Sequence, residues 1–334
     1  MKINLRKSLI CINQQKLIAI FLVFMFLGFT LAKPEFASSY SINNILCTMA
    51  LYGIASLGMT LVILTGGTDL SAGSVMALSG VIGAGLLGKA FSAANPVSLP
   101  FAATVLIALI FSGLIGYLNG IVITKLKIAP FVATLAMMSI ARGLVYVVAD
   151  SVVQGVSGSP ITFMNDGYSL LGQGKIGAVP VQFIVYVILF LIVFVFLKYT
   201  RTGRSIYTVG GNIDTAKLAG IKTNKIIVLT YTVSSILVGI SGLILVGRLS
   251  SASTVAAKGY ELDFITAVAL GGTSVAGGRG SVIGTLLGTA FLAVLNNGLD
   301  IVNVKSFYQY LIKGLILVFA VCADLFMNKR VKKS

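Results

Sequence analysis

Apolar runs long enough to cross a bilayer recur along almost the whole 334-residue chain, and they restrict its fold more than any other feature. A helix needs about 20 predominantly apolar residues to span the hydrocarbon core. By that measure the apolar segments lie at 16-32, 45-65, 71-88, 97-123, 130-149, 181-198, 225-247, 262-276, 280-297 and 306-326. The sequence therefore predicts an all-α polytopic transmembrane helical bundle of about ten spans, in a single domain over residues 1-334, with the eighth span the shortest.

The composition agrees with a protein that is solvated largely by lipid. Apolar residues make up 57% of the chain and charged residues 10%, which exceeds the apolar share that a soluble fold of this length carries. A net charge of +16 would suggest nucleic acid in a soluble protein. Here the Lys and Arg residues fall between the apolar segments, as topology signals do, so we expect contact with membrane lipid and no nucleic-acid partner.

The distribution of Lys and Arg also predicts which connections face the cytoplasm. With the N-terminus in the cytoplasm, the inner connections hold Lys125, Lys127, Arg279 and the basic tail 329-333, as the excess of positive charge on cytoplasmic loops requires. The sequence therefore predicts an even number of spans, with the N- and C-termini both cytoplasmic. The longest polar outer segment, 150-180, is predicted to be an external loop that could meet an external partner.

A hydrophilic island at 198-225, KYTRTGRSIYTVGGNIDTAKLAGIKTNK, separates two long apolar runs and faces the cytoplasm in this topology. An island of this kind in a membrane protein indicates a docking surface for another protein. Its centre, from Gly210 to Ile221, predicts a short helix between glycines that presents Ala216 and Leu218. The candidate docking residues are Gly210, Gly211, Asn212, Asp214, Ala216, Leu218 and Gly220.

Residue types that carry enzyme chemistry are scarce. The chain has no histidine, which excludes histidine-based zinc sites, Ser-His-Asp and Cys-His catalysis, and histidine proton relays. Its three cysteines lack metal-ligand spacing. Glu261 and Asp263 are two positions apart and point to different faces of a helix, so helix N-terminal charge is favoured over a catalytic or ion site. We expect no catalytic residue and no metal site.

Two glycine-rich turns resemble each other. The stretch from Leu64 to Val75, LTGGTDLSAGSV, has a counterpart from Leu270 to Val282, LGGTSVAGGRGSV, and in the predicted topology the two copies run parallel. Transporters break membrane helices at such corresponding positions and expose backbone to a pathway. The candidate pathway or gating residues here are Gly66, Gly67, Gly271 and Gly272, with a chance likeness of glycine-rich turns as the alternative.

A few polar residues within or beside the apolar segments admit two roles. Asp69 could act in the pathway or in gating, because an ionisable group near the membrane is costly and by default functional, or it could cap the helix that begins near Ser71. Asn119, Asn296 and Asn297 could bond across helices or line a polar pathway. Arg142 is expected to make a polar contact between helices.

Five groups of motifs, in one order along nearly the whole chain, carry a resemblance to a known family. The motifs are GMTLVILTGGTDLSAGS at Gly58-Ser74, ATLAMMSIARG at Ala133-Gly143, TRTGRSIYTVGGNIDTAKLAGI at Thr200-Ile221, GRLSSA and GYELDFITAVALGGTSVAGGRGSVIGT between Gly247 and Thr285, and LNNGL at Leu295-Leu299. They resemble the permease subunits of bacterial ABC importers for ribose and related monosaccharides, the binding-protein-dependent inner membrane components.

The resemblance implies a bacterial inner-membrane protein that works with partners. Two permease copies, as a homodimer or a heterodimer, would form the channel; two cytoplasmic ABC ATPase subunits would bind ATP and Mg; and an external or periplasmic sugar-binding protein would deliver the solute. A short cytoplasmic helix of such permeases fits a groove in the ATPase, and Gly210 to Ile221 matches that element. The chain itself would bind no cofactor and would not catalyse ATP hydrolysis.

The motifs restrict the solute less than they restrict the family. Ribose is the foremost expectation, and galactose, allose and inositol fit the same motifs. A permease for nucleosides or branched-chain amino acids is a nearer alternative than a secondary sugar carrier, because no span shows the repeated acidic residues expected of a proton- or sodium-coupled carrier.

Overall fold

The computed structural model of the protein describes residues 5–87, 99–152, 160–163 and 165–332, and nearly all of these are helical. The helices are α1 (Leu5–Ala32), the 3-10 helix η1 (Pro34–Ala37), α2 (Ser39–Leu64), α3 (Ala72–Gly85), α4 (Phe101–Lys125), α5 (Pro130–Val152), α6 (Asp166–Gln173), α7 (Val181–Tyr199), α8 (Arg201–Gly211), α9 (Ile213–Leu218), α10 (Thr223–Leu249), α11 (Tyr260–Leu270), α12 (Val282–Ile301) and α13 (Ser306–Lys332). The strands are β1 (Ile161–Thr162), β2 (Lys175–Ile176), β3 (Val179–Pro180) and β4 (Ser251–Ala252).

Hydroxyl and amide side chains set where several helices begin. Ser38 accepts a hydrogen bond from Ser41 N before α2, Thr200 from Gly203 N before α8, and Ser281 from Gly284 N before α12. These bonds satisfy backbone N–H groups that have no partner within the helix. Each cap follows a connection between apolar segments, so polar residues end one element and start the next.

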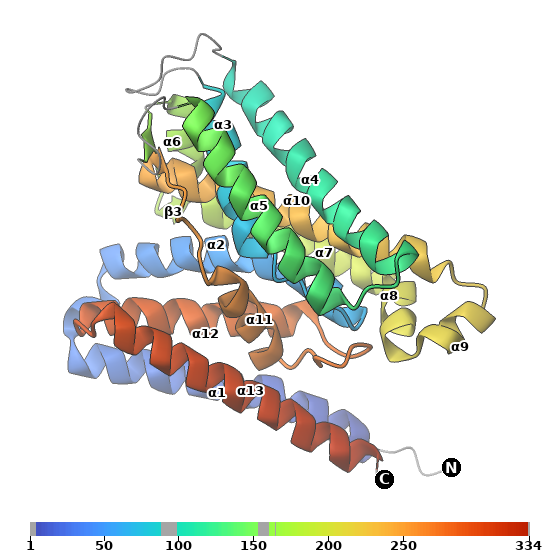
Figure 1. The fold of residues 1–334 in the computed structure, drawn as a ribbon. Helices are drawn as coiled ribbons and strands as arrows, with labels where there is room; N and C mark the ends of the chain where they lie inside the picture. The colour runs from blue at the N-terminus through green and yellow to red at the C-terminus, as the bar shows by residue number, and fades with distance from the viewer. Residues whose placement is uncertain (1–4, 88–98, 153–159, 164, 333–334) are drawn as a thin grey trace.

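Helix α2 forms the centre of the bundle (Figure 1). Every residue from Ala50 to Leu64 is buried, and α2 packs against α7, α10, α11 and α12. Helices α3, α4 and α5 lie on one side of this centre, and α1, α12 and α13 lie on the other (Figure 1). The principal apolar core therefore follows α2, α3 and α10 through the middle of the bundle.

Small residues let these central helices approach closely. A Cβ added at Gly58 of α2 would lie 2.8 Å from the Cα atom of Ser234 in α10, and one at Gly80 of α3 would overlap Val246. Close backbone approach at small residues is typical of helix association in membranes, where lipid removes the ordinary hydrophobic drive between helices.

The predicted spans coincide with helices, although not all of these helices can cross a membrane alone. In the described residues, seven helices are long and apolar enough to span a bilayer by length and composition. The short helices α3 and α11 have 14 and 11 residues, and at about 1.5 Å per residue α11 is roughly 16 Å long. The eighth predicted span, 262-276, is thus helical only as far as Leu270, and irregular backbone follows from the C-cap Gly271 onward.

The two ends of the bundle carry different elements. One end holds α8, α9 and the connection between α4 and α5, and α1 begins and α13 ends on this same side (Figure 1). The opposite end holds α6 and the strands, and β1 pairs with β4 so that the loop predicted to be external is tied to the end of α10. Part of the predicted loop 150-180, at 153–159 and 164, lies outside the described residues.

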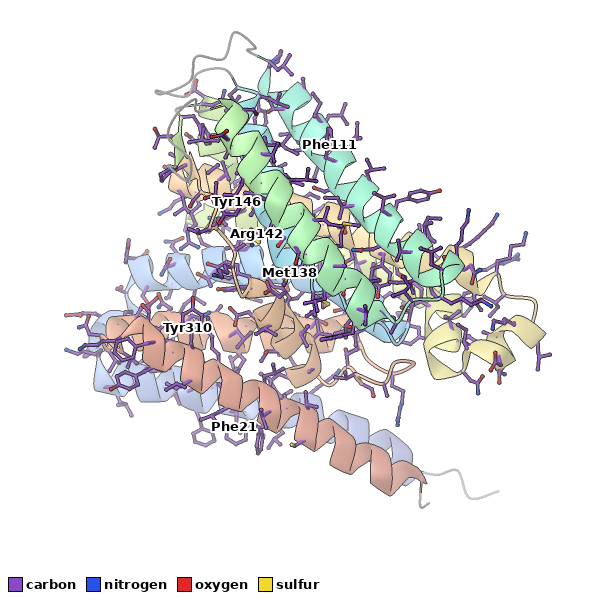
Figure 2. All side chains as sticks on the ribbon, in the orientation of Figure 1. Phe21, Phe111, Met138, Arg142, Tyr146 and Tyr310 are labelled. Carbon is purple, nitrogen blue, oxygen red and sulfur yellow. The ribbon has the colours of Figure 1, made fainter. Side chains whose placement is uncertain are left out.

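Apolar side chains project outward over the long helices, as lipid contact requires. Phe21 on α1 and Phe111 on α4 point away from the bundle (Figure 2) and are 57% and 47% exposed. Arg142, midway along α5, is charged and bonds within the protein instead. Its Nη1 donates to the carbonyl oxygens of Thr254 at 2.9 Å and Ala256 at 3.0 Å. Arg142 therefore makes a polar contact, but with the backbone of the connection between α10 and α11 rather than with another helix, as was predicted.

Candidate functional site

The hydrophilic island folds into two short helices rather than one. Helix α8 ends at Gly211, and Asn212 caps α9 by accepting hydrogen bonds from the backbone N–H groups of Asp214 and Thr215, both at 2.9 Å. Asp214 and Lys217 pair at 3.1 Å on the exposed surface, where such a pair contributes little stability. The sequence thus forms α9 from local signals: an N-cap, an acidic residue in the first turn and a basic residue in the last.

The expectation that α9 presents both Ala216 and Leu218 is wrong for one of them. Leu218 is 91% exposed, whereas Ala216 is completely buried. The two side chains are two positions apart, so they cannot lie on the same face of a helix. Gly220, with φ of 76°, ends α9, because only a residue that tolerates the left-handed region closes this turn easily.

Gly210 does not flank the exposed helix but lies buried in the contact of α8 with the rest of the protein. A Cβ added at Gly210 would overlap the carbonyl oxygen of Leu64 and lie 2.7 Å from the N atom of Gly278. Gly211 has open space around the same position. Gly210 is therefore the point where the island touches the ends of the transmembrane helices.

The two glycine-rich turns end α2 and α11 with the same hydrogen-bond pattern. Gly66 N donates to Ile63 O at 2.9 Å and Gly67 N to Val62 O at 3.2 Å; Gly272 N donates to Ala269 O at 3.0 Å and Thr273 N to Val268 O at 3.2 Å. This is the Schellman arrangement, which requires a left-handed residue after the helix, and φ is 81° at Gly66 and 87° at Gly272.

The geometry corrects the residue equivalence between the turns. Gly66 corresponds to Gly272, and Gly67 to Thr273, so the Gly-Gly pairs that look equivalent in sequence are offset by one residue. Gly271 has the distinct role of letting α11 approach α12, since a Cβ there would overlap the carbonyl oxygen of Gly284. The likeness between the turns is thus one of backbone conformation.

The turns and the island meet in one place, which we call the glycine junction: residues 64–67, 276–278 and 210–211. Gly278 N donates to Leu64 O at 3.0 Å. A Cβ at Gly277 would lie 2.8 Å from the Cα atom of Gly66 and 2.9 Å from Gly210 O. The structure therefore brings Gly66 to Gly210 and Gly211, which lie far from it in the sequence, at the end of the bundle that carries α9.

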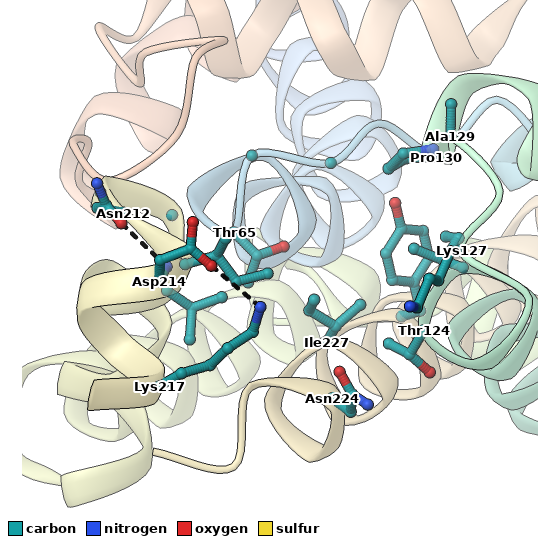
Figure 3. Close-up of a pocket in the computed structure, with 18 of the residues that line it drawn as sticks. Thr65, Thr124, Lys127, Ala129, Pro130, Asn212, Asp214, Lys217, Asn224 and Ile227 are labelled. Carbon is teal, nitrogen blue, oxygen red and sulfur yellow. Dashed lines mark hydrogen bonds and ion pairs between the residues drawn. The ribbon is translucent and has the colours of Figure 1, made fainter. Parts of the chain in front are cut away.

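A cavity of about 810 Å³ opens beside the glycine junction. Asn212, Asp214 and Lys217 lie on one side of it, and Lys127, Ala129 and Pro130 lie on the other (Figure 3). Asn224 and Ile227 of α10 line it between these two walls. The arrangement forms a recess between α9 and the connection of α4 with α5, open to the side predicted to be cytoplasmic.

Asp69 is completely buried and follows the last residue of the first glycine-rich part of the junction, Gly67, by two positions. Its Oδ1 accepts from Ser71 N at 2.9 Å and from Ser71 Oγ at 2.6 Å, and Asn119 Nδ2 donates to Ser71 Oγ at 3.0 Å. Burial raises the pKa of Asp69, and the bonds from Ser71 oppose that rise. In this geometry Asp69 stabilises the turn before α3 through its bonds with Ser71. Asn119 links α4 to the same turn through its bond to Ser71.

Asn296 and Asn297 lie at the opposite end of the molecule, away from the glycine junction. Asn297 Nδ2 donates to Ser41 Oγ at 2.7 Å, and its Oδ1 accepts from Asn44 Nδ2 at 2.7 Å. Asn297 therefore bonds α12 to α2. Asn296 lines a second, smaller cavity at this end.

The match to a known family decides what kind of protein has this geometry. The family described as the permease component of the branched-chain amino acid transport system matches residues 41–321. The chain belongs to this permease family. The matched range includes both glycine-rich turns, the island, α2 except for its first two residues, and the helices from α3 to α12.

Curated relatives of this permease are sugar import permeases. It is 40% identical to the ribose import permease protein of Bacillus subtilis (strain 168) over 297 residues, 88% of each chain. It is 39% identical to the ribose import permease protein of Escherichia coli (strain K12), over 93% of each chain, and 35% identical to the galactose/methyl galactoside import permease protein of that organism, over 90% of each chain. No solved structure matches it.

Three residues of the permease that contribute to this site were not predicted from its sequence. Leu64 and Gly278 meet Gly210 through backbone atoms, which leaves no mark in the residue types. Tyr231 donates from its Oη to Thr68 O at 3.0 Å and fills the space that a side chain at Gly67 would need. A tyrosine in the apolar run of α10 was the one available signal, since a buried tyrosine hydroxyl needs a partner.

Proposed function

We propose that this protein is the membrane-spanning permease subunit of an ATP-driven, binding-protein-dependent importer of a monosaccharide, with ribose the foremost solute. The observation that carries the proposal is likeness over nearly the full length to permeases named for ribose and galactose import. The buried glycine contacts and the exposed α9 supply the parts that such a subunit needs.

In this proposal α9 is the element that a cytoplasmic ABC ATPase holds. Leu218 offers an almost fully exposed apolar side chain at a surface otherwise rich in polar groups, and burying such a side chain against a partner is favourable by about 1.5 to 3 kcal/mol. The recess beside α9 gives a partner side chain somewhere to enter. ATP and Mg bind to the ATPase, and this chain contributes no catalytic group.

The glycine junction then transmits the motion of α9 to the transmembrane helices. Gly210 lies against Leu64, the last residue of α2, and against Gly278, in the turn before α12. A shift of α8 cannot be absorbed by side-chain rearrangement there, because backbone meets backbone. Closure of the ATPase would thus favour one arrangement of α2 and α12 over another, and switch access from the outside to the inside.

The remaining partners lie at the other end and at the side of the bundle. The external loop with α6, held to α10 by β1 and β4, faces the sugar-binding protein, and a second permease copy completes the channel in the bacterial inner membrane. With the binding protein delivering the solute at the external loop, solute recognition rests mostly with the binding protein.

Uptake of labelled monosaccharides into proteoliposomes tests the proposal. The liposomes contain this chain and its binding protein, with and without the ATPase and ATP. We expect uptake only with both ATPase and ATP, and ribose foremost in a panel that includes galactose, allose and inositol. Uptake by this chain alone would make it a carrier or channel and overturn the proposal.

A second solute class is favoured by the family description, which names branched-chain amino acids. Heat protection of the purified binding protein separates the classes: protection by leucine, isoleucine or a nucleoside, and by no sugar, would assign the importer to that class.

A further inference from the structure

A polar cavity of about 400 Å³ lies at the outer end of the bundle, far from the glycine junction. It is bounded by the outer ends of α2, α10, α11, α12 and α13 within one chain. Its size falls in the range of small-molecule sites, about 300 to 1,000 Å³. The residues that carry the argument are Tyr52, Arg248, Tyr260, Asn296, Tyr310 and Lys313.

Asn296 points to a ligand because its carboxamide oxygen is unused. The residue is 9% exposed, and Oδ1 has no hydrogen-bond partner among the described residues. Leaving a buried acceptor without a donor costs about 1 to 3 kcal/mol, and such groups are rare in folded proteins. Oδ1 is closed off from solvent in this arrangement, and a rotation of the carboxamide, which lines the cavity, would turn it toward the hydroxyl group of a ligand.

The polar groups around Asn296 are already fixed in place. Arg248 donates from Nη1 to Thr48 Oγ1 and from Nη2 to Asn44 Oδ1, and Asn44 in turn donates to Asn297. Gln309 donates to Asp300 Oδ1 at 2.8 Å. These bonds hold the lining in a fixed geometry before anything binds, which lowers the entropy cost of binding.

The charges around the cavity cancel. Arg248 and Lys313 are the cations of its lining, Asp300 is the carboxylate of its lining, and Lys313 pairs with Asp263 at 3.1 Å just behind it. Two cations and two carboxylates give no net charge. A neutral ligand therefore fits the site better than an anion or a cation, each of which would leave its own charge uncompensated in a partly buried place.

Aromatic rings give the cavity its apolar surface. Tyr52 and Tyr260 lie with ring centroids 5.2 Å apart, and Tyr310 lies on the outer turn of α13 (Figure 2). Ring faces pack against the C–H groups of a sugar ring, while amides and a guanidinium bond its hydroxyls. The combination of aromatic surface, fixed amides and balanced charge suits a compact polyhydroxylated molecule.

We propose that this outer cavity is a binding site for a neutral polyhydroxylated solute of monosaccharide size, within a single permease chain. The assignment deepens the proposed function and rests on it for the expectation that the solute is the imported sugar. It gives the imported sugar a place to bind on the outer side before the pathway opens.

The absence of tryptophan from the chain makes the site directly measurable. Tyr310→Trp introduces a single tryptophan at the cavity, in the full-length chain reconstituted in lipid nanodiscs and titrated with D-ribose, D-galactose and D-allose. We expect a saturable change in tryptophan emission with at least one of these sugars. The control Tyr117→Trp, on an exposed face of α4, is expected not to respond.

Substitutions in the reporter background locate the binding. Asn296→Leu removes the unused oxygen and should weaken binding about tenfold, which corresponds to about 1.4 kcal/mol. Asn43→Leu is the matched control, because Asn43 also has an unpartnered amide oxygen but lies outside the cavity. Asn296→Ser, which adds no bulk, serves if the leucine variant fails to elute as a folded protein.

The outcomes are distinct. No saturable response to any sugar, or an equal response in the Asn296 variants, would overturn the site. A response to glycerol phosphate without one to the neutral sugars would assign the cavity to an anionic headgroup and also overturn it. The titration needs neither ATPase nor ATP, so a failure of ATP-driven uptake would overturn the proposed function while leaving this measurement intact.

Discussion

Gly210 and Gly211 are neighbours in the last turn of α8 with very different surroundings. At Gly210 the backbone of Leu64 and Gly278 fills the place of a Cβ, and at Gly211 that place is open. A methyl group at Gly210 must push backbone apart, and backbone cannot rotate away as a side chain can. Both glycines lie in the same turn of α8, so the same substitution at each has a similar effect on helix propensity. A difference between the two variants therefore reports the contact between the island and the transmembrane helices.

Gly210→Ala should lower both stability and transport, and Gly211→Ala should not. We expect Gly210→Ala to destabilise the protein by about 1 to 3 kcal/mol, as overpacking does, and Gly211→Ala to be neutral or stabilising by up to about 1 kcal/mol. Thermal unfolding of the purified chain and ATP-driven uptake measure the two effects. Equal behaviour of the two variants would show that the close contact at Gly210 is unimportant.

Asp69 can be tested by separating its charge from its hydrogen-bonding oxygen. Asp69→Asn keeps an oxygen that can accept from Ser71 N, so we expect uptake within about twofold of wild type if its role is to hold the turn; Asp69→Ala should cost about 0.5 to 2 kcal/mol, as the loss of a cap does. Uptake and thermal unfolding are the measurements. Loss of uptake in Asp69→Asn with unchanged stability would instead assign the charge to gating.

Helix α9 is short, and its stability comes from its ends. Asn212 begins it, and Gly220 N and Ile221 N close it with bonds to Lys217 O at 2.9 Å and Ala216 O at 3.0 Å. This closing pattern is the same as that of α2 and α11. Leu218 is thereby held on the outside while Ala216 is held inside, which makes Leu218 the residue for a partner to contact.

Leu218→Arg should weaken capture of the ATPase about tenfold or more, because it puts an unpaired charge where an apolar side chain would be buried. The measurement is co-purification of the cognate ATPase with the membrane-extracted permease. Leu170→Arg is the control, since Leu170 is also well exposed, at 60%, but lies on α6 at the opposite end. Equal ATPase capture by both variants and wild type would move the docking contact away from α9.

The left-handed glycines of the two turns can be tested as equivalents. Gly66→Ala and Gly272→Ala each force an L-residue into positive φ, at a cost of about 1 to 2 kcal/mol. Gly66→Asn and Gly272→Asn should cost less, because asparagine tolerates that region. Thermal unfolding of the four variants is the measurement. A larger loss for Thr273→Ala than for Gly272→Ala would contradict the equivalence of Gly66 with Gly272.

For the helices, the sequence predicted where they lie along the chain well, but predicted poorly which residues pack between them. Apolar runs of span length placed the helices, and the predicted end of the second span at 65 agrees with the end of α2 at Leu64, whereas the predicted span 262-276 runs past the end of α11 at Leu270. The sequence failed on Ala216, because the side on which α9 packs is set by α8 and α10, not by α9 itself. It also gave no sign that Gly210 meets Gly278, since contacts through backbone leave no side-chain pattern.

The arrangement of the two ends makes the topology testable for the whole molecule. We expect Lys305→Cys, before α13, to react with an impermeant maleimide in intact cells, and Lys217→Cys, on α9, to react only after permeabilisation. The three native cysteines are first replaced by serine. Labelling of both positions from the outside would contradict the even number of crossings and the cytoplasmic position of the island.

The pairing of the first helix with the last ones has a consequence for how the protein is made. Gln15 on α1 donates from Nε2 to Ser281 Oγ at 2.7 Å, across a separation of 266 residues, and Phe29 fills the space beside Gly298. At a synthesis rate of about 5 to 20 residues per second, α1 waits in the bilayer for roughly 10 to 50 seconds before α12 exists. Its largely unburied apolar surface suits that wait, and a nascent chain stopped before Ser281 should therefore hold α1 in lipid, in contact with η1 and the start of α2 but without its contacts to α12.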